Sequence, residues 1–174
     1  MSELNGHPDP TRYVGVKLIE EYLDRHGWKA HTSEEEAHEA EGLVRTGWVD
    51  EQGRLNQLII DPIVERDLVG FIVPGVAEAK PSVISPLWLS DLLMVVSYRN
   101  YRSLRGKWAY DPRDGEISFR HHEGVPQGMS FEHFEQVLGV IVAEVTAFGG
   151  IARAVADGSR AASDVFEEWE IIPG

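Results

Sequence analysis

Apolar side chains recur at helical spacing in three stretches of the chain and alternate with polar ones in others. The first helical stretch has five apolar positions at a period of three to four: Val14, Leu18, Ile19, Tyr22 and Leu23. Asp9 and Thr11 are the candidate N-caps of this helix, and Gly27 is its candidate end. Trp28 follows at once and is expected to fold back onto the core.

Three strands are predicted next, because residues 44–49, 55–60 and 68–73 are short, apolar and rich in β-branched side chains. The segment from Glu51 to Arg54 is a turn signal between the first two strands. The second strand is allowed to continue past Pro62, and Pro74-Gly75 is expected to close the third.

A second helix is predicted from Ser85, with Pro86 at its first position. Its expected apolar stripe is Leu89, Leu92, Leu93, Val96 and Tyr101. A hairpin follows, with strands at 107–110 and 116–120 joined by the turn Asp111 to Gly115. Ser130 is the expected N-cap of a long final helix that buries Phe131, Phe134, Val137, Leu138, Ile141, Val145 and Phe148.

The element order is therefore α-β-β-β-α-β-β-α, which predicts an α+β fold with an antiparallel five-stranded sheet and helices packed on it. Residues 1–12 are expected to be a flexible N-terminus, 13–158 a single domain, and 159–174 a C-terminal tail. The acidic segment 31–42 is predicted as a solvated loop or a short polar helix. Helices covering one face leave the other face, or an exposed edge strand, as the natural contact surface.

Composition narrows the function. The formal net charge of −13 repels phosphate backbones, so nucleic acid is not an expected partner. No apolar run in the sequence reaches the length needed to span a bilayer, and the N-terminus has no signal-peptide pattern, so no membrane partner is expected. The chain has no cysteine, which excludes disulfides and thiolate metal sites and makes the cytoplasm the expected location.

Histidines are the candidate chemical groups. His121 and His122 are neighbours on a strand and point to opposite faces, so one metal ion is not expected to bind both. His31 and His38 lie among glutamates and are interpreted as parts of a solvated segment, and His133 as a surface residue. No serine-nucleophile or phosphate-loop motif is present. We therefore expect no catalytic residue, no metal and no cofactor; the alternative is an enzyme with an unrecognised site of histidines and carboxylates.

Aromatic and arginine side chains cluster at the end of the second predicted helix. Both residue types are enriched in binding hot spots, so a partner-binding role is one interpretation. Cations also suit a helix C-terminus, so a capping role is the other, and the sequence leaves both open. The candidate partner-binding residues are Tyr98, Arg99, Tyr101, Arg102 and Arg105.

The region around the hairpin resembles the YbjN family, described as proposed bacterial sensory transduction regulators. The matching features are Asn100, Gly106-Lys107-Trp108, the turn Asp111 to Gly115, Phe119-Arg120, the N-terminal segment Tyr22 to Ala30, and Val155 to Gly158. The resemblance covers roughly residues 13–158; the acidic insertion 31–42 departs from it. The family is similar in fold to the type III secretion chaperones, which are small, acidic and often homodimeric, and no catalytic residues are carried over.

These observations together favour a non-enzymatic, cytoplasmic, chaperone-like or regulatory protein. We expect it to form a homodimer and to bind a protein or peptide partner.

Overall fold

The computed structural model describes residues 14–32, 42–80 and 84–170. The elements follow in the order α1 (Val16–His26), β1 (Val44–Val49), β2 (Leu55–Ile63), a short 3-10 turn (Val64–Arg66), β3 (Leu68–Glu78), α2 (Pro86–Arg102), β4 (Lys107–Tyr110), β5 (Glu116–Gly124), α3 (Phe131–Ala156) and α4 (Ala162–Glu170).

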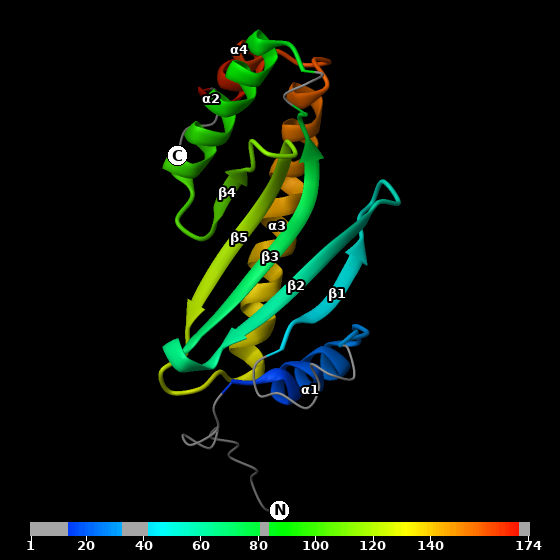
Figure 1. Ribbon diagram of the computed structural model, residues 1–174, viewed down its shortest axis with the longest axis vertical. Helices are drawn as coiled ribbons and strands as arrows, with labels where there is room; N and C mark the ends of the chain where they lie inside the picture. The colour runs from blue at the N-terminus through cyan, green and yellow to red at the C-terminus, as the bar shows by residue number, and fades with distance from the viewer. Residues whose placement is uncertain (1–13, 33–41, 81–83, 171–174) are drawn as a thin grey trace, which may run out of the picture.

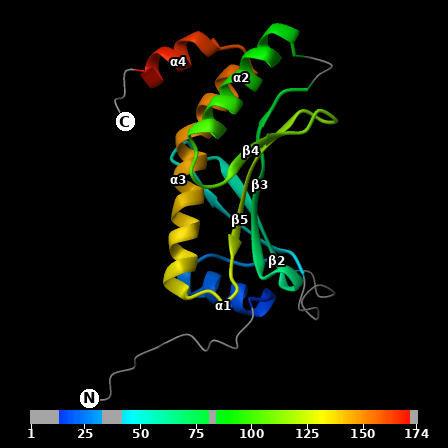
Figure 2. The same cartoon turned by 90° about the vertical axis from the view of Figure 1, so that its left-hand side faces the viewer.

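The five strands form one antiparallel sheet in the order β1-β2-β3-β5-β4 (Figure 1). The helix α3 runs along one face of the sheet (Figure 2). The helix α1 lies near the N-terminal end of α3, and α2 and α4 lie near its C-terminal end. No described helix lies on the opposite face of the sheet. The predicted α+β class, antiparallel sheet and element order are confirmed, with α4 as an additional helix.

The core lies between α3 and the sheet. Alternate residues of the central strands face α3, and Phe71 and Phe119 are fully buried there. From α3, Phe134 approaches Phe71 with 6.3 Å between ring centroids, and Phe148 approaches Trp108 at 4.7 Å. By length and composition α3 is apolar enough to cross a membrane, but here its apolar side chains build the core beneath the sheet.

Helix ends follow local chemistry. Gly27 ends α1 with a left-handed φ of 87°, as predicted, because a side chain is strained in that conformation. The Oγ of Ser85 accepts a hydrogen bond from Leu87 N, and the Oγ of Ser130 accepts one from His133 N. The start of α1 differs from the prediction: its N-cap is Gly15, which has no side chain to act as a cap.

The third strand was predicted to end at Pro74-Gly75, and this prediction is wrong. The strand β3 continues to Glu78. Its pairing with β5 shifts register between Val73 and Ala77, and this irregularity accommodates a proline that cannot donate to the ladder. On α3, the guanidinium of Arg153 donates to the carbonyl of Val76 at 3.0 Å and holds the bulged segment.

The segment after α3 is not a simple tail, because residues 162–170 form the helix α4. Val165 is fully buried, and Trp169 stacks on Tyr98 of α2 with 5.3 Å between ring centroids and an angle of 17°. Phe166 meets the same tyrosine edge-on at 5.4 Å. The α4 helix therefore adds an aromatic layer over α2.

Some predictions concern residues outside the described ranges. The flexible terminus 1–12, with the candidate caps Asp9 and Thr11, is outside them. So is most of the acidic segment 31–42, including His38. His31 is described: it forms an isolated bridge with Arg45 at the outer edge of β1.

Candidate partner-binding surfaces

The five residues predicted to bind a partner separate into two groups. Arg99 and Tyr98 are engaged within the molecule, whereas Tyr101, Arg102 and Arg105 are exposed. Arg102 leans back toward Tyr98: its Nη1 lies 3.4 Å from the tyrosine hydroxyl and its guanidinium carbon 5.9 Å from the ring centre. Of the predicted cluster, Tyr101 and Arg105 remain most available to another molecule.

Arg99 is held by a carboxylate on α3. Its Nε and Nη2 donate to the two oxygens of Glu144 at 2.8 and 2.5 Å, and Trp108 Nε1 donates to the same carboxylate at 2.9 Å. Burial alone raises the pKa of Glu144, but the hydrogen bonds from Arg99 and Trp108 and the charge of Arg99 bring it below its ordinary value. The Glu144 carboxylate therefore joins α2, α3 and β4, and Arg99 is engaged within the domain.

The outer face of α2 is apolar and unpartnered among the described residues. Leu87 is 68% exposed, Met94 49% and Tyr101 87%, and these residues are spaced by seven. Serines at 90 and 97 lie between them and are also exposed. We call Leu87, Ser90, Met94, Ser97 and Tyr101 the α2 stripe. This seven-residue spacing is the pattern by which one helix packs along another.

The predicted stripe of α2 is therefore half correct. Leu92 and Val96 are buried beneath the helix, but Leu93 is 38% exposed and Tyr101 points outward. The sequence-based prediction missed Leu87 and Met94, because α2 is apolar on two sides and the pattern alone does not say which side is covered. The seven-residue repeat of 87, 94 and 101 was the available signal.

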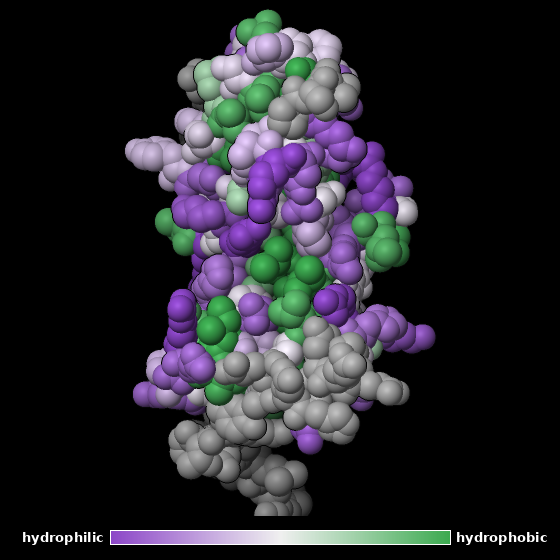
Figure 3. Space-filling view, viewed as in Figure 1, coloured by the Kyte–Doolittle hydropathy of each residue, from purple (hydrophilic) through white to green (hydrophobic). Residues whose placement is uncertain are grey.

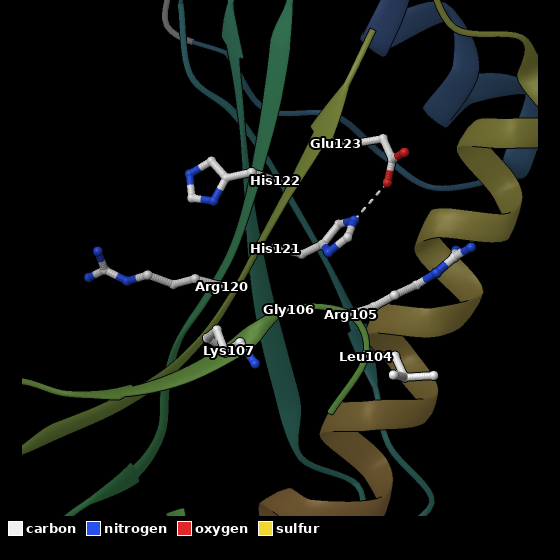
Figure 4. Close-up of a pocket in the computed structure, with 8 residues that line it drawn as sticks. All are labelled: Leu104, Arg105, Gly106, Lys107, Arg120, His121, His122 and Glu123. Atoms are coloured by element: carbon white, nitrogen blue, oxygen red, sulfur yellow. Dashed lines mark hydrogen bonds and ion pairs between the residues drawn. The ribbon is translucent and has the colours of Figure 1, made fainter. Parts of the chain in front are cut away.

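A second candidate surface is an open slot beside β5. The short β4 pairs only with residues 117–120 of β5, so residues 121–124 have a strand neighbour on the β3 side alone. A hollow of about 510 Å³ lies there, lined by residues 104–107 and 120–123 (Figure 4). We call it the β5 slot. Leu104, at its rim, is fully exposed.

The sheet face without helices is mixed in character. Ile59 pairs with Ile72 across β2 and β3, and Ile63 with Leu68; all four are only half-buried, whereas their neighbours toward α3 are fully buried. Apolar side chains gather over the middle of this face and polar ones surround them (Figure 3). A further hollow of about 830 Å³ lies over β1 and β2 beside the end of α1, and is lined in part by Trp28, Leu55 and Pro74.

His121 and His122 line the β5 slot, and His121 is linked through Glu123 to His133. His121 is buried and His122 is exposed on the other face, as the strand pattern predicts. Nε2 of His121 lies 2.9 Å from one oxygen of Glu123, and Nε2 of His133 lies 3.2 Å from the other. His133 is thus partly covered and not simply a surface residue. Among the described residues, no three His, Cys, Asp or Glu side chains are placed to hold a metal ion.

Solved structures with this arrangement include YbjN from E. coli, a proposed transcription regulator, with 19% identity, a TM-score of 0.51, and coverage of 85% of this chain and 93% of that one. The ExsC–ExsE complex matches with 13% identity, a TM-score of 0.52, and coverage of 79% and 92%. The fold is YbjN-like. The fold expected from the resemblance, which is also type III secretion chaperone-like, is thereby confirmed. No protein-family model and no curated protein matches this YbjN-like chain.

Proposed function

We propose that this YbjN-like protein is a non-enzymatic, cytoplasmic, chaperone-like or regulatory module that binds another protein and acts as a homodimer. The observation that carries the dimer is the α2 stripe. Large apolar side chains at 49–87% exposure cost free energy in water, and an equivalent stripe on a second copy covers them symmetrically.

The geometry of α2 favours a second copy as the occupant of its stripe. A two-fold axis brings the same face of both helices together, so the α2 stripe of one copy packs against the α2 stripe of the other, with Met94 at its centre. The two intervening serines are small enough for close approach of the helices. The alternative, an enzyme with a His and carboxylate site, has less support, because His121, Glu123 and His133 satisfy one another within the fold.

The binding of a different protein is supported by the shape of the domain and by its relatives. One face of the sheet and part of an edge strand stay uncovered by described residues, and ExsC is seen in a complex with ExsE. The charge of −13 argues against nucleic acid as the partner, and the absence of cysteine suits the cytoplasm.

Size-exclusion chromatography with light scattering tests the dimer. We expect a mass of twice 19.5 kDa at micromolar concentration. Met94→Glu should yield a monomer, because it places two buried, unpaired carboxylates at the two-fold axis. The matched control is Leu55→Glu, at a 75% exposed residue of β2, which should remain dimeric. A monomeric wild-type chain, or an equal loss in both variants, contradicts the α2 dimer.

The protein-binding role needs its own measurement. Affinity purification of the tagged full chain under several growth conditions should recover a protein partner. Excess untagged chain should compete for this partner and reduce its recovery. If no protein is recovered whose amount falls when untagged chain is added, this part of the proposal is contradicted, and the dimer measurement is unaffected.

A further inference from the structure

We propose that the β5 slot binds an extended, acidic peptide segment that adds a strand to the sheet in line with β4. This inference rests on the proposed protein-binding function and gives the chemistry and place of one partner segment. Three features of the described residues support it: an unpaired strand edge, a fixed end to the slot, and a group of cations that form no ion pair.

The strand edge is available because β4 is short. Asp111 N donates to Glu116 O, so the even-numbered residues of β5 direct their backbone groups toward β4. The pairing of β4 with β5 ends at Lys107 and Arg120. His122 is the next residue whose N–H and carbonyl point to this side, and no described strand lies opposite it. An incoming strand can pair there as β4 pairs above it.

The chain before β4 cannot extend into the slot. Gly106 has a left-handed φ of 69°, which turns the backbone out of the strand direction, and a Cβ on it would lie 2.2 Å from Cζ of Phe119, so only glycine fits there. The Oγ of Ser103 donates to the carbonyl of Arg105 at 2.7 Å and fixes the turn. The start of β4 is thus fixed by this turn, and β4 does not lengthen to cover the slot.

The charge of the slot is opposite to that of the protein. Arg105, Lys107 and Arg120 line it, and none of them forms an ion pair with any residue in the described ranges. Lys107 donates instead to the carbonyls at the end of α2, at 2.9 Å from Asn100 O. The one carboxylate at the slot, Glu123, is engaged by two histidines. On a chain with a net charge of −13, three cations without an ion pair among the described residues therefore line this slot.

Two of these cations are placed against each other. Lys107 and Arg120 are directly opposite in the β4–β5 register, where like charges destabilise a strand pair. The Arg120 side chain points away from Lys107 (Figure 4). An acidic side chain on an added strand relieves this repulsion, which an apolar or basic peptide does not. This cross-strand pair of cations therefore favours an acidic ligand over a basic or an apolar one.

The test uses fluorescence anisotropy with the full chain and a labelled short peptide that alternates glutamate and valine. The same peptide with lysine in place of glutamate, and one N-methylated along the edge that pairs with His122, are the comparison probes. We expect the acidic peptide to bind, with affinity that falls as salt rises, and both comparison peptides to bind at least about tenfold more weakly.

The protein variant is Arg120→Glu, with Arg54→Glu as a control at another exposed arginine far along the sheet, at the β1–β2 turn. The introduced glutamate faces Lys107 favourably, so the variant should unfold at an equal or higher temperature while its affinity for the acidic peptide falls about tenfold or more. Arg54→Glu should keep the affinity to within about twofold. A gain in folding stability with a loss of binding is not produced by a purely structural role.

Four outcomes overturn the inference: no binding of the acidic peptide to the wild-type chain, equal binding of the N-methylated peptide, equal loss in the two variants, or preferential binding of a single-stranded oligonucleotide at the same arginine. These outcomes are separate from the test of the proposed function. If a specific protein partner binds the Arg120→Glu variant as well as it binds wild type, the protein-binding role stands but does not use the β5 slot.

Discussion

Arg99 and Glu144 join α2 to α3 through two parallel hydrogen bonds, with both side chains largely withdrawn from solvent. Trp108 of β4 donates to the same carboxylate, so three elements meet at one group. An arginine read from the sequence as a partner-binding residue is thus a cross-link within the domain.

Arg99→Ala should lower the free energy of unfolding by about 2 kcal/mol, because it removes two of the three hydrogen-bond donors to the Glu144 carboxylate and leaves that group in a low-dielectric seam with Trp108 alone. Urea unfolding followed by tryptophan fluorescence measures the change. Arg102→Ala is the control: this exposed arginine lies three residues along α2, and its removal should change stability by less than about 0.5 kcal/mol. Equal losses in the two variants contradict the structural role of Arg99.

The same carboxylate gives a pH dependence. The pKa of Glu144 is lower in the folded chain than its ordinary value of 4.5, so the unfolded chain binds its proton more readily. Its stabilising contribution is complete above the ordinary pKa and is lost as the pH falls through the lower folded value. Glu144→Gln should therefore be less stable than wild type at about pH 7, with a gap that shrinks toward about pH 3. A gap that stays constant across this range contradicts the shift.

Gly106 tests the turn that begins β4. Gly106→Ala should cost about 3 kcal/mol, since it adds a clash with the Phe119 ring to the strain of a left-handed alanine. Gly53→Ala provides the comparison: Gly53 has a φ of 75° but no atom within 4 Å of an added Cβ, so only the backbone strain of about 1 kcal/mol applies. Unfolding midpoints of the two variants give the difference, and similar costs at both positions contradict the clash.

Local chemistry made much of the fold predictable from the sequence. The hairpin turn from Asp111 to Gly115 closes as expected, with Gly115 at a φ of 82°. Ser85 with Pro86 and Ser130 mark the starts of two helices. Each of these signals acts within a few residues, so it does not depend on what packs against it.

Features set by tertiary contact were harder to predict. Pro74-Gly75 favours a strand end, but the pairing with β5 and the bond from Arg153 carry β3 through it. The helix α4 has apolar residues at 165, 166 and 169, a helical spacing too short to be decisive by itself. Arg99 looked free for a partner because its acid, Glu144, lies 45 residues away in the chain. The sequence shows no such long-range pairing.

The close approach of Val76 to Gly149 restrains any sliding of the main helix along the sheet. A Cβ at position 149 would lie 2.9 Å from Cγ1 of Val76, so neither neighbouring turn of α3, with Val145 or Arg153, fits at that point. This contact therefore opposes a one-turn shift of α3 along the sheet. In the proposed dimer, in which the second copy covers the α2 stripe, the avidity of a chain with two acidic segments for the two β5 slots is then governed by the length of the linker between those segments.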